Sequence, residues 1–348
     1  MIQAKAYAAQ SANSPLTPIE FQRRDVGVND VLIHIDYCGV CHSDIHSARN
    51  EWGGAQYPLI PGHEIVGHII RVGAKVTKFK VGDIAGVGCM VDSCRSCPSC
   101  EKHLEQFCDK GAIFTYNSPE KNMRTPTYGG YSSQIVTDEN FVLKISPKLD
   151  LARVAPLLCA GITTYSPLKH WKVKKGDRVG VVGLGGLGHM AVKIAVSMGA
   201  EVTMLSTSSS KEADAMKLGA HKFANTNDAK SFQTYANYFD LIINTISAQH
   251  DYGKFLSMIN IDGTMVLLGI PPKPTEVHAF SFIGRRRSLA GSLIGGIQET
   301  QEMLDYCAEK NILSDIELIN IDQINSAYER MIKGDVRYRF VINMKSLK

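Results

Sequence analysis

Short apolar runs separated by glycine and proline dominate the first part of the chain. Between residues 31 and 142, β-branched residues gather in segments such as 31–35 and 64–72, and turn-forming residues interrupt these segments. Runs of this length and composition predict β-strands joined by turns. We therefore expect a compact β-rich domain in this part of the chain.

A different pattern begins after Leu151, where apolar strands alternate with helical periodicity. Residues 177–182 form an apolar run, and the apolar residues from Leu187 to Met198 recur at helical spacing until Gly199. Glycine is a typical residue just past the end of a helix. Repeated β-α units with short connections predict a parallel, doubly wound sheet. Its further strands are expected at 202–205, 240–245 and 264–268, and its further helices at 211–218 and 252–259.

The residues from Ser292 onward do not obviously continue this sheet. They predict a helix near 299–310 and a closing strand near 337–344, and this tail could return to the first domain. A chain of 348 residues also exceeds the roughly 100–200 residues of one ordinary domain. The predicted fold class is therefore α/β, with a β-rich domain and a doubly wound parallel-sheet domain.

The overall composition limits the kind of partner. Apolar residues make up 44% and charged residues 21% of the chain, which argues against a disordered or coiled-coil protein. The formal net charge of +4 is too small to predict binding to nucleic acid or to an anionic membrane. No apolar run reaches the length of a membrane-spanning helix, and the N-terminus lacks the pattern of a signal peptide. We expect a small-molecule partner.

Cysteine is frequent and unevenly distributed. The chain has nine cysteines, an odd number that fits reduced thiols or thiolate metal ligands better than a disulfide framework. We therefore expect a cytoplasmic protein. Seven of the nine lie within the first 108 residues, so any metal chemistry is expected to begin early in the chain.

A glycine-rich turn follows the strand predicted at 177–182. Residues Gly183, Gly185, Gly186, Leu187 and Gly188 lie in the pattern G-x-G-x-x-G, at the opening of the predicted amphipathic helix. The glycines permit a tight turn, close approach of a pyrophosphate and close packing of helix on strand, and the helix N-terminus favours negative charge. The alternative is a glycine-rich turn without a ligand. The strand–helix context favours a dinucleotide.

The residues after the next predicted strand indicate which dinucleotide binds. An NAD site carries an acidic residue there, which accepts hydrogen bonds from the adenosine ribose. This chain has Ser206, Thr207, Ser208 and Lys211 instead. Hydroxyl donors and a cation suit a 2′-phosphate, which a carboxylate would repel. We predict NADP(H), the alternative being a solvated serine loop.

Four cysteines lie close together in the sequence. Cys94, Cys97, Cys100 and Cys108 follow the spacing C-x2-C-x2-C-x7-C, which lets one loop surround a tetrahedral ion. Four thiolates leave no open position for substrate, so the predicted role is a structural zinc site. An iron–sulfur centre, which typically has a different spacing, and free thiols are the alternatives.

A second possible metal set is dispersed. It consists of Cys41, His63, Glu64 and Cys159. Spacing alone does not assemble these residues, and each of them could equally be an ordinary core or surface residue. A zinc-protease helix is excluded because it needs a second histidine four residues after His63, where the chain has Gly67.

Several independent motifs in one order point to a known family. Gly-His-Glu at 62–64, the four-cysteine loop, Cys-Ala-Gly at 159–161 and the glycine turn resemble the zinc-dependent medium-chain alcohol dehydrogenases over nearly the whole chain. The similarity is greater to the cinnamyl-alcohol dehydrogenase branch and its bacterial aldehyde-reductase relatives. It rests on residues 38–44, 50–52, 57–58, 61–67, 158–165 and 335–340.

This resemblance implies a domain organisation and a set of metal ligands. Residues 1–152 and 290–348 would form a GroES-like catalytic domain with both zinc sites, and 153–289 an inserted Rossmann domain that binds NADP(H). Two zinc ions per chain are implied. The catalytic zinc would be bound by Cys41, His63 and Cys159, with Glu64 as an alternate or neighbouring ligand.

The resemblance also implies roles in catalysis. Ser43 would pass a proton to or from the zinc-bound oxygen, and His46 would connect it through the cofactor ribose to solvent. Asp44 would accept a hydrogen bond from His63, and Arg337 would lie near Glu64. Thr163 is counted among the cofactor-binding residues.

Four apolar residues match the substrate-pocket positions of this branch: Trp52, Phe114, Leu293 and Ile294. Each of them could equally be a core residue. Bulky apolar walls favour aromatic or medium-length aliphatic substrates over sugars, although Phe114 departs from the tryptophan common in plant relatives. Cys38, Cys89 and Cys307 match no ligand position and are expected to be buried thiols, and Arg285–Arg287 to form a solvated turn.

The resulting hypothesis is an NADP(H)-dependent zinc alcohol dehydrogenase or aldehyde reductase acting on a small aldehyde or alcohol, expected from the resemblance to be a homodimer. A polyol or secondary-alcohol dehydrogenase of the same superfamily is the nearest alternative. A non-catalytic zinc and nucleotide-binding protein is an alternative of another class, but it would have no need of Cys41, His63, Cys159 and Ser43 together. A zinc-free quinone reductase would normally lack these ligands.

Overall fold

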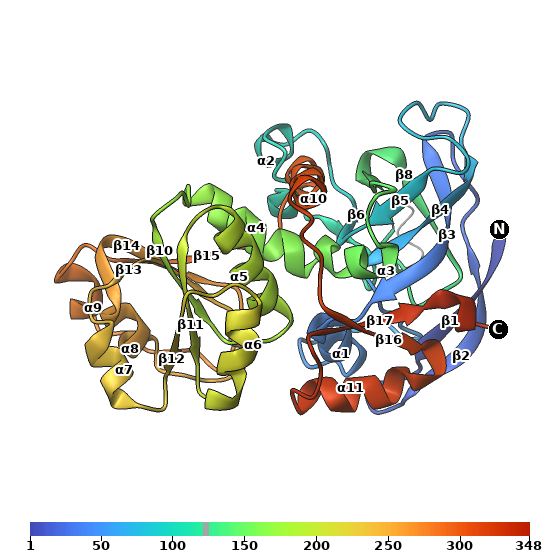
Figure 1. Ribbon diagram of the computed structural model, residues 1–348. Helices are drawn as coiled ribbons and strands as arrows, with labels where there is room; N and C mark the ends of the chain where they lie inside the picture. The colour runs from blue at the N-terminus through green and yellow to red at the C-terminus, as the bar shows by residue number, and fades with distance from the viewer. Residues whose placement is uncertain (121–124) are drawn as a thin grey trace. The chain divides into compact units, whose positions relative to one another are not determined.

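The computed structural model describes residues 1–120 and 125–348, and the chain divides into two compact units (Figure 1). Unit 1 contains Met1–Cys159 and Gly295–Lys348, and unit 2 contains Ala160–Ile294. The boundaries expected after residues 152 and 289 lie a few residues before these divisions. The second expected boundary falls inside a strand of unit 2, Ser288–Gly291, so residues 290–294 belong to unit 2.

The centre of unit 1 is a seven-stranded sheet. Its strands follow the order β16-β17-β3-β4-β5-β9, and β8 pairs with β3. Pairing is antiparallel except between β16 and β17. The strands are β3 (Asp30–Gly39), β4 (Ile65–Val72), β5 (Ile84–Val87), β8 (Gln134–Asp138), β9 (Leu143–Lys144), β16 (Ile316–Asn320) and β17 (Arg339–Asn343).

Smaller elements surround this sheet. Two further pairs of strands are β1 (Ile2–Ala9) with β2 (Leu16–Arg23), and β6 (Met90–Asp92) with β7 (Ile113–Phe114). The helices of unit 1 are α1 (His42–Ala48), α2 (Pro98–Glu101), α3 (Leu151–Val154), α10 (Ile297–Lys310) and α11 (Ile324–Ile332).

The C-terminal tail completes unit 1. Strand β17, predicted at 337–344, pairs with β3 through residues such as Ile342 opposite Cys38, so the expected return of the tail is confirmed. Its apolar side chains join one core with those of β3 and β4. Strand β16 and helix α11 were not predicted.

Unit 2 contains a six-stranded sheet whose strands are all parallel. Helices α5 and α6 cover one face and α7 and α8 the other (Figure 1). The strands are β10 (Arg178–Val182), β11 (Glu201–Ser206), β12 (Lys222–Asn225), β13 (Phe239–Asn244), β14 (Ile259–Leu267) and β15 (Ser288–Gly291). The helices are α4 (Ala160–His170), α5 (Gly186–Ser197), α6 (Glu212–Lys217), α7 (Ala229–Thr234), α8 (Tyr252–Ser257) and α9 (Phe280–Ile283).

The strand order of this sheet defines where a ligand can bind. It is β12-β11-β10-β13-β14-β15, which is the order 3-2-1-4-5-6 of dinucleotide-binding sheets. The order reverses between β10 and β13, and ligands of such sheets bind beyond the carboxyl ends of the strands at this point. The predicted doubly wound sheet is therefore confirmed. In the described part of the chain, no helix is both long and apolar enough to cross a membrane.

Candidate functional site

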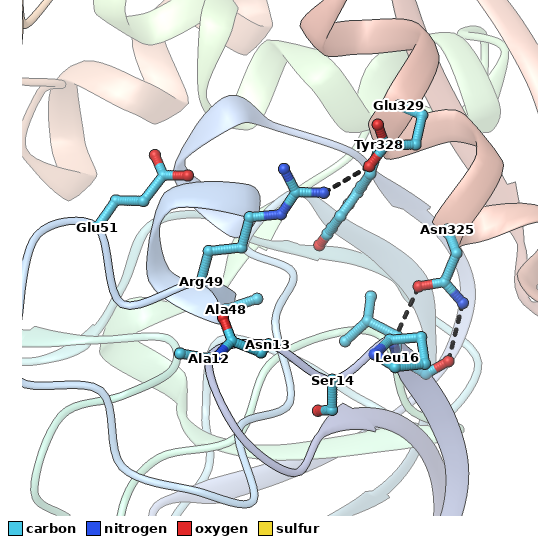
Figure 2. Close-up of a pocket in the computed structure, with 11 residues that line it drawn as sticks. Ala12, Asn13, Ser14, Leu16, Ala48, Arg49, Glu51, Asn325, Tyr328 and Glu329 are labelled. Atoms are coloured by element: carbon cyan, nitrogen blue, oxygen red, sulfur yellow. Dashed lines mark hydrogen bonds and ion pairs between the residues drawn. The ribbon is translucent and has the colours of Figure 1, made fainter.

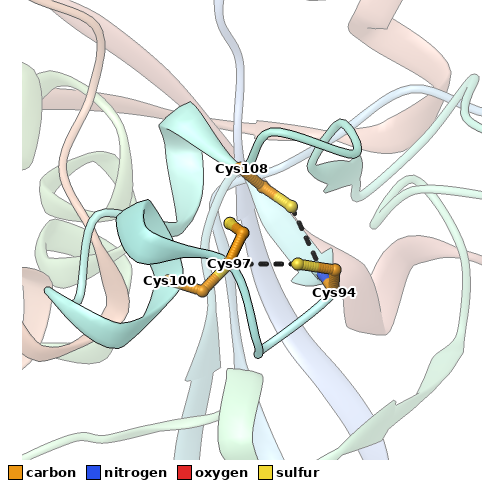
Figure 3. A group of neighbouring side chains, drawn as sticks. All are labelled: Cys94, Cys97, Cys100 and Cys108. Atoms are coloured by element: carbon orange, nitrogen blue, oxygen red, sulfur yellow. Dashed lines mark hydrogen bonds between the residues drawn. The ribbon is translucent and has the colours of Figure 1, made fainter.

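The four-cysteine loop lies between β6 and β7 in unit 1. The sulfurs of Cys94, Cys97, Cys100 and Cys108 all lie within 4.8 Å of one another (Figure 3). Backbone N–H groups donate to two of them, from Cys94 to the Cys108 sulfur and from Asp109 to the Cys97 sulfur, each at 3.4 Å. Such donors stabilise thiolate charge. A set of four sulfurs and no other donor fits a closed tetrahedral zinc site.

The dispersed set also comes together, from three separate segments of unit 1. The donor atoms of Cys41, His63, Glu64 and Cys159 lie within 4.8 Å of one another, and all four residues are buried. Cys41 is the residue before α1, His63 and Glu64 come directly before β4, and Cys159 follows a short 3-10 turn after α3. The sulfurs of Cys41 and Cys159 are 3.9 Å apart. Folding therefore brings together four residues that their spacing in the sequence does not place near one another.

The ring of His63 has one nitrogen facing a carboxylate and one without a partner. Its Nδ1 lies 3.4 Å from Oδ1 of Asp44. Its Nε2 is buried and makes no hydrogen bond to any described residue. Leaving such a nitrogen unpaired is costly, whereas a carboxylate on one ring nitrogen with the other free is the arrangement of a metal-binding histidine. The cluster thus fits a metal ion.

Glu64 is held by a buried arginine. Its Oε1 forms an ion pair with Arg339, and both side chains are almost completely buried. The expectation that Arg337 occupies this place is wrong. Arg337 precedes β17, and its backbone N–H donates to Glu317, whereas Arg339 is the first residue of the strand. On the expected strand 337–344 the two arginines would lie on the same face, so the sequence pattern does not separate them, whereas the observed strand begins only at Arg339.

The pKa values of the two thiols of this cluster are shifted in opposite directions. A hydrogen bond from Cys159 lowers the pKa of Cys41 well below its usual range, against the effect of burial, and the positive charge of Arg339 adds to this. The same hydrogen bond raises the pKa of Cys159. Thiolates are the form in which cysteines bind metal.

A third thiol, Cys89, lies near the cluster. It is only half-buried, and a hydrogen bond from Cys159 lowers the pKa of its thiol despite burial. The expectation of a fully buried thiol is therefore wrong for Cys89. Cys38 and Cys307 are fully buried, as predicted.

The predicted proton-relay residues lie on helix α1. The hydroxyl of Ser43 is 3.6 Å from the Cys41 sulfur. The Nδ1 of His46 is 2.5 Å from a carboxylate oxygen of Glu51, and the ring of His46 lies 4.9 Å from that of Trp52. Glu51 was not predicted as a site residue. Its only sequence signal is its place in the motif 50–52.

In unit 2 the glycine turn has the geometry that a dinucleotide needs. Gly183 has a φ of +91°, and a Cβ on Gly188 would lie 1.9 Å from the Gly183 carbonyl oxygen, so both positions require glycine for the fold. A Cβ on Gly185 would meet no atom within 4 Å. The protein itself therefore does not require glycine there, but a pyrophosphate against this backbone does. Helix α5 begins at the next residue.

The hydroxyl-rich segment begins at the end of β11. Ser206 is the last residue of that strand, and its hydroxyl accepts a hydrogen bond from the Ser208 backbone at 3.3 Å. The ammonium of Lys211 donates to the carbonyl of Leu184 at 3.0 Å, so this lysine lies against the glycine turn. Thr207 is exposed, and Thr163 is buried in helix α4.

The predicted substrate-pocket residues divide equally between the units. Trp52 and Phe114 belong to unit 1, and Leu293 and Ile294 are the last residues of unit 2. The first three have large exposed surfaces.

The expected solvated turn at Arg285–Arg287 is wrong for its last residue. Arg287 is partly buried and donates to the carbonyl of Ile259 and the side chain of Asn237. Arg286 is exposed and forms an ion pair with Asp262.

A unit that gathers two cysteine-containing clusters, in the same chain as a dinucleotide-binding sheet, defines a metal-dependent dehydrogenase. Comparison with known proteins agrees. Residues 27–147 match the alcohol dehydrogenase GroES-like domain, and residues 186–309 match the zinc-binding dehydrogenase family. The chain belongs to the zinc-dependent medium-chain alcohol dehydrogenases.

Relatives similar over the full length include two bacterial enzymes and two solved structures. The NADP-dependent alcohol dehydrogenase C 1 of Mycolicibacterium smegmatis is 54% identical, with 100% of each chain covered. The aldehyde reductase YahK of Escherichia coli is 53% identical, with 99% of each covered. A cinnamyl alcohol dehydrogenase of Sorghum bicolor (TM-score 0.97, 42% identity) and the CAD of Helicobacter pylori complexed with NADP(H) (TM-score 0.94, 46%) each match 100% of this chain and 99% of their own.

Proposed function

We propose that this protein is an NADP(H)-dependent zinc alcohol dehydrogenase, or aldehyde reductase, that interconverts aldehydes and primary alcohols by hydride transfer. The observation that carries this proposal is the buried cluster of Cys41, His63, Glu64 and Cys159 with its unpartnered imidazole nitrogen. Two relatives above 50% identity, named as an NADP-dependent alcohol dehydrogenase and an aldehyde reductase, support it.

Two zinc ions per chain are proposed. Cys41, His63 and Cys159 hold the catalytic ion, with Glu64 as a neighbouring or alternate ligand, and three ligands leave the open position that catalysis needs. When bound, zinc supplies a Lewis acid that stabilises negative charge on the substrate oxygen. Asp44 fixes the ring orientation of His63. The second ion lies in the loop of Cys94, Cys97, Cys100 and Cys108.

Proton transfer is assigned to helix α1. Ser43 holds or releases a proton at its hydroxyl beside Cys41, and His46 exchanges protons with solvent. Because Glu51 binds the Nδ1 of His46, the other ring nitrogen is free to exchange. Replacing His46 with Gln should lower kcat near neutral pH by about 10²-fold. An unchanged pH–rate profile would remove His46 from this role.

The cofactor is proposed to be NADP(H). The glycine turn, Gly183 to Gly188, receives the pyrophosphate, and Thr163 also contacts the cofactor. The 2′-phosphate is bound by hydroxyls and one cation, from Ser206, Thr207, Ser208 and Lys211. Steady-state kinetics with both cofactors test this: we expect a lower KM for NADPH than for NADH, and a preference for NADH would contradict the assignment.

The substrates are proposed to be aromatic or medium-chain aliphatic aldehydes and alcohols. The apolar residues Trp52, Phe114, Leu293 and Ile294 favour such molecules over sugars. A substrate panel provides the test. Benzaldehyde and cinnamaldehyde should be reduced efficiently, while sorbitol and threonine should be poor substrates for oxidation. The reverse ranking would favour a polyol or secondary-alcohol dehydrogenase.

The protein is further proposed to be a cytoplasmic homodimer. None of the nine cysteines, all of which lie in the described residues, forms a disulfide, which fits a reducing compartment. Strand β15 is an edge of the unit 2 sheet, and nearby Phe280 and Ile283 are 71% and 68% exposed. An unpaired edge beside apolar side chains is a typical dimer surface. Light scattering should give twice the chain mass, and Phe280→Glu should shift the protein toward monomer.

A further inference from the structure

A buried phenol lies behind the carboxylate that faces His63. Tyr131 is completely buried, and its hydroxyl donates to Oδ2 of Asp44 at 2.9 Å. We propose that Tyr131 is a positioning residue of the catalytic metal site, which acts through Asp44 on His63 and thereby sets how tightly the site holds zinc. This inference rests on the proposed function, in which His63 is a zinc ligand.

The carboxylate of Asp44 accepts several hydrogen bonds. It has no exposed surface. Its Oδ2 accepts from the backbone N–H of Cys41 at 2.9 Å and from the Tyr131 hydroxyl, and its Oδ1 accepts from the backbone N–H of Gly62 at 3.1 Å. The same Oδ1 faces His63. The carboxylate therefore binds the backbone of one proposed ligand, Cys41, and that of Gly62, the residue before another. Tyr131 helps to fix the plane in which the carboxylate oxygens face the imidazole.

The same tyrosine supports the backbone that carries His63. The segment Gly129–Tyr131 runs beside residues 60–62, with N–H to carbonyl distances of 2.8, 2.8 and 3.0 Å. A Cβ on Gly62 would lie only 2.7 Å from the Tyr131 ring, and Gly62 has a φ of +102°. The ring therefore packs directly on the residue before His63. The ring and the hydroxyl of Tyr131 therefore have separable roles. The ring packs on the backbone, and the hydroxyl donates to the carboxylate of Asp44.

A buried arginine fixes this segment from the other side. The guanidinium of Arg23 donates to the carbonyls of Tyr128 and Gly129 and to the hydroxyl of Ser132, at 2.8 to 3.0 Å. Tyr131 is thus held on both sides of its position in the chain. A side chain held in this way has little freedom to turn its hydroxyl away from Asp44.

A second tyrosine, Tyr328, is also buried in unit 1. The side chain of Tyr328 interacts with that of Tyr131, and it also lines a cavity of about 630 Å³ together with Leu16, Arg49 and Asn325 (Figure 2). Two polar pairs are drawn there, Arg49 with Glu329 and the Asn325 side chain with the Leu16 backbone (Figure 2). Tyr131 itself does not line this cavity. Its hydroxyl is therefore committed to Asp44 and is not available to solvent.

The effect on zinc affinity follows from this position. Groups that orient a ligating histidine typically change metal affinity by 10–100-fold when removed. The hydroxyl of Tyr131 acts through Asp44 rather than directly on the imidazole ring of His63. We therefore expect removal of this hydroxyl to weaken zinc affinity about tenfold, at the lower end of this range.

The experiment is a zinc competition on the holoenzyme loaded with two zinc ions per chain. Tyr131→Phe keeps the ring and removes the hydroxyl. A chelator titration should show an approximately tenfold weaker Kd for the cluster of His63 and an unchanged Kd for the four-cysteine loop. Tyr57→Phe is the matched control, because the Tyr57 hydroxyl makes a hydrogen bond of the same length, 2.9 Å, to the Ala48 carbonyl. This control should leave both zinc affinities unchanged.

A double-mutant cycle distinguishes positioning from a general structural role. In an Asp44→Asn background, Tyr131→Phe should weaken zinc binding less than twofold, because the acceptor through which the hydroxyl acts has been altered. If Tyr131 only supports the fold, its substitution would have the same effect in both backgrounds. That result would contradict the proposal.

Two further outcomes overturn the inference. One is an unchanged zinc affinity in Tyr131→Phe. The other is that both Tyr131→Phe and Tyr131→Met lose the loop zinc and no longer unfold cooperatively. Methionine is included because its adaptable side chain fills the space of the ring. This outcome would show that Tyr131 acts only in maintaining the fold. Failure of the proposed function is seen separately, since the unsubstituted protein would then bind no zinc at the His63 cluster.

Discussion

The two cysteine clusters of unit 1 are built in opposite ways. One is carried by a single loop of fifteen residues, with sulfur as its only donor type and Cys94 partly exposed. The other joins three distant segments, mixes sulfur, nitrogen and oxygen donors, and is buried with a carboxylate and a guanidinium behind it. A closed site therefore needs only local chain geometry. An open site needs a surrounding fold to orient each ligand.

The largest expected effect comes from removing a ligand of the dispersed cluster. His63→Ala should lower kcat/KM by about 10³-fold or more, because Lewis-acid stabilisation of charge is worth several kcal/mol. Steady-state kinetics and metal analysis measure it. One zinc per chain should remain, in the loop. Activity within tenfold of the unsubstituted enzyme would show that this cluster is not the reactive centre.

The ion pair behind Glu64 gives a second test of the dispersed cluster. Arg339→Met leaves a buried carboxylate without its partner, which costs about 3–5 kcal/mol. Chemical denaturation should show this loss in the free energy of unfolding. The loop cluster has no ion pair among its four ligands, so it offers no corresponding substitution. A stability equal to that of the unsubstituted protein would mean that the carboxylate is not charged in the folded state.

Removal of a loop ligand should affect stability rather than chemistry. Cys97→Ser should remove one zinc per chain and lower the free energy of unfolding by about 2 kcal/mol or more, as loss of a metal site does. The kcat of the folded protein should stay within about twofold, because the loop has no open position for substrate. A loss of kcat as large as that of His63→Ala would contradict the assignment of a structural role to the loop cluster and a catalytic role to the dispersed cluster.

A smaller difference concerns thiol reactivity after removal of the metal. A hydrogen bond from the Ser96 backbone lowers the pKa of Cys94 to about 6, while burial raises that of Cys100 to about 11. Above pH 6 Cys94 is therefore a thiolate and should be alkylated first, and its rate should fall as the pH drops below 6. Mass spectrometry after iodoacetamide treatment measures this order. Equal labelling of all four cysteines would contradict it.

The sequence predicts the loop cluster and the doubly wound sheet because both depend on local patterns. The spacing from Cys94 to Cys108 and the glycine turn after β10 lie within short stretches of chain. The dispersed cluster could be named only through a family resemblance. Cys41, His63 and Cys159 are brought together by the pairing of β3 with β4 and by the turn after α3, and neither contact is visible in residue spacing.

The errors have physical causes of the same kind. Arg337 and Arg339 lie on one face of the expected strand 337–344, so periodicity does not distinguish them, although the observed strand begins only at Arg339. Cys89 is close to Cys159 only in the folded chain. The role of Glu51 depends on a contact with His46 made after helix α1 has ended. Strand β12 was not predicted because it is short and only partly apolar. Its pairing with β11 stabilises a strand that its own sequence does not indicate.

Selective removal of one metal ion separates the roles of the two clusters. A chelator should withdraw zinc from the cluster of Cys41, His63 and Cys159 while the four-cysteine loop keeps its ion, as counted by metal analysis. We predict that NADPH-dependent reduction of benzaldehyde then falls to near the background rate and returns when zinc is added back. Full activity in protein that holds only the loop ion would contradict the account.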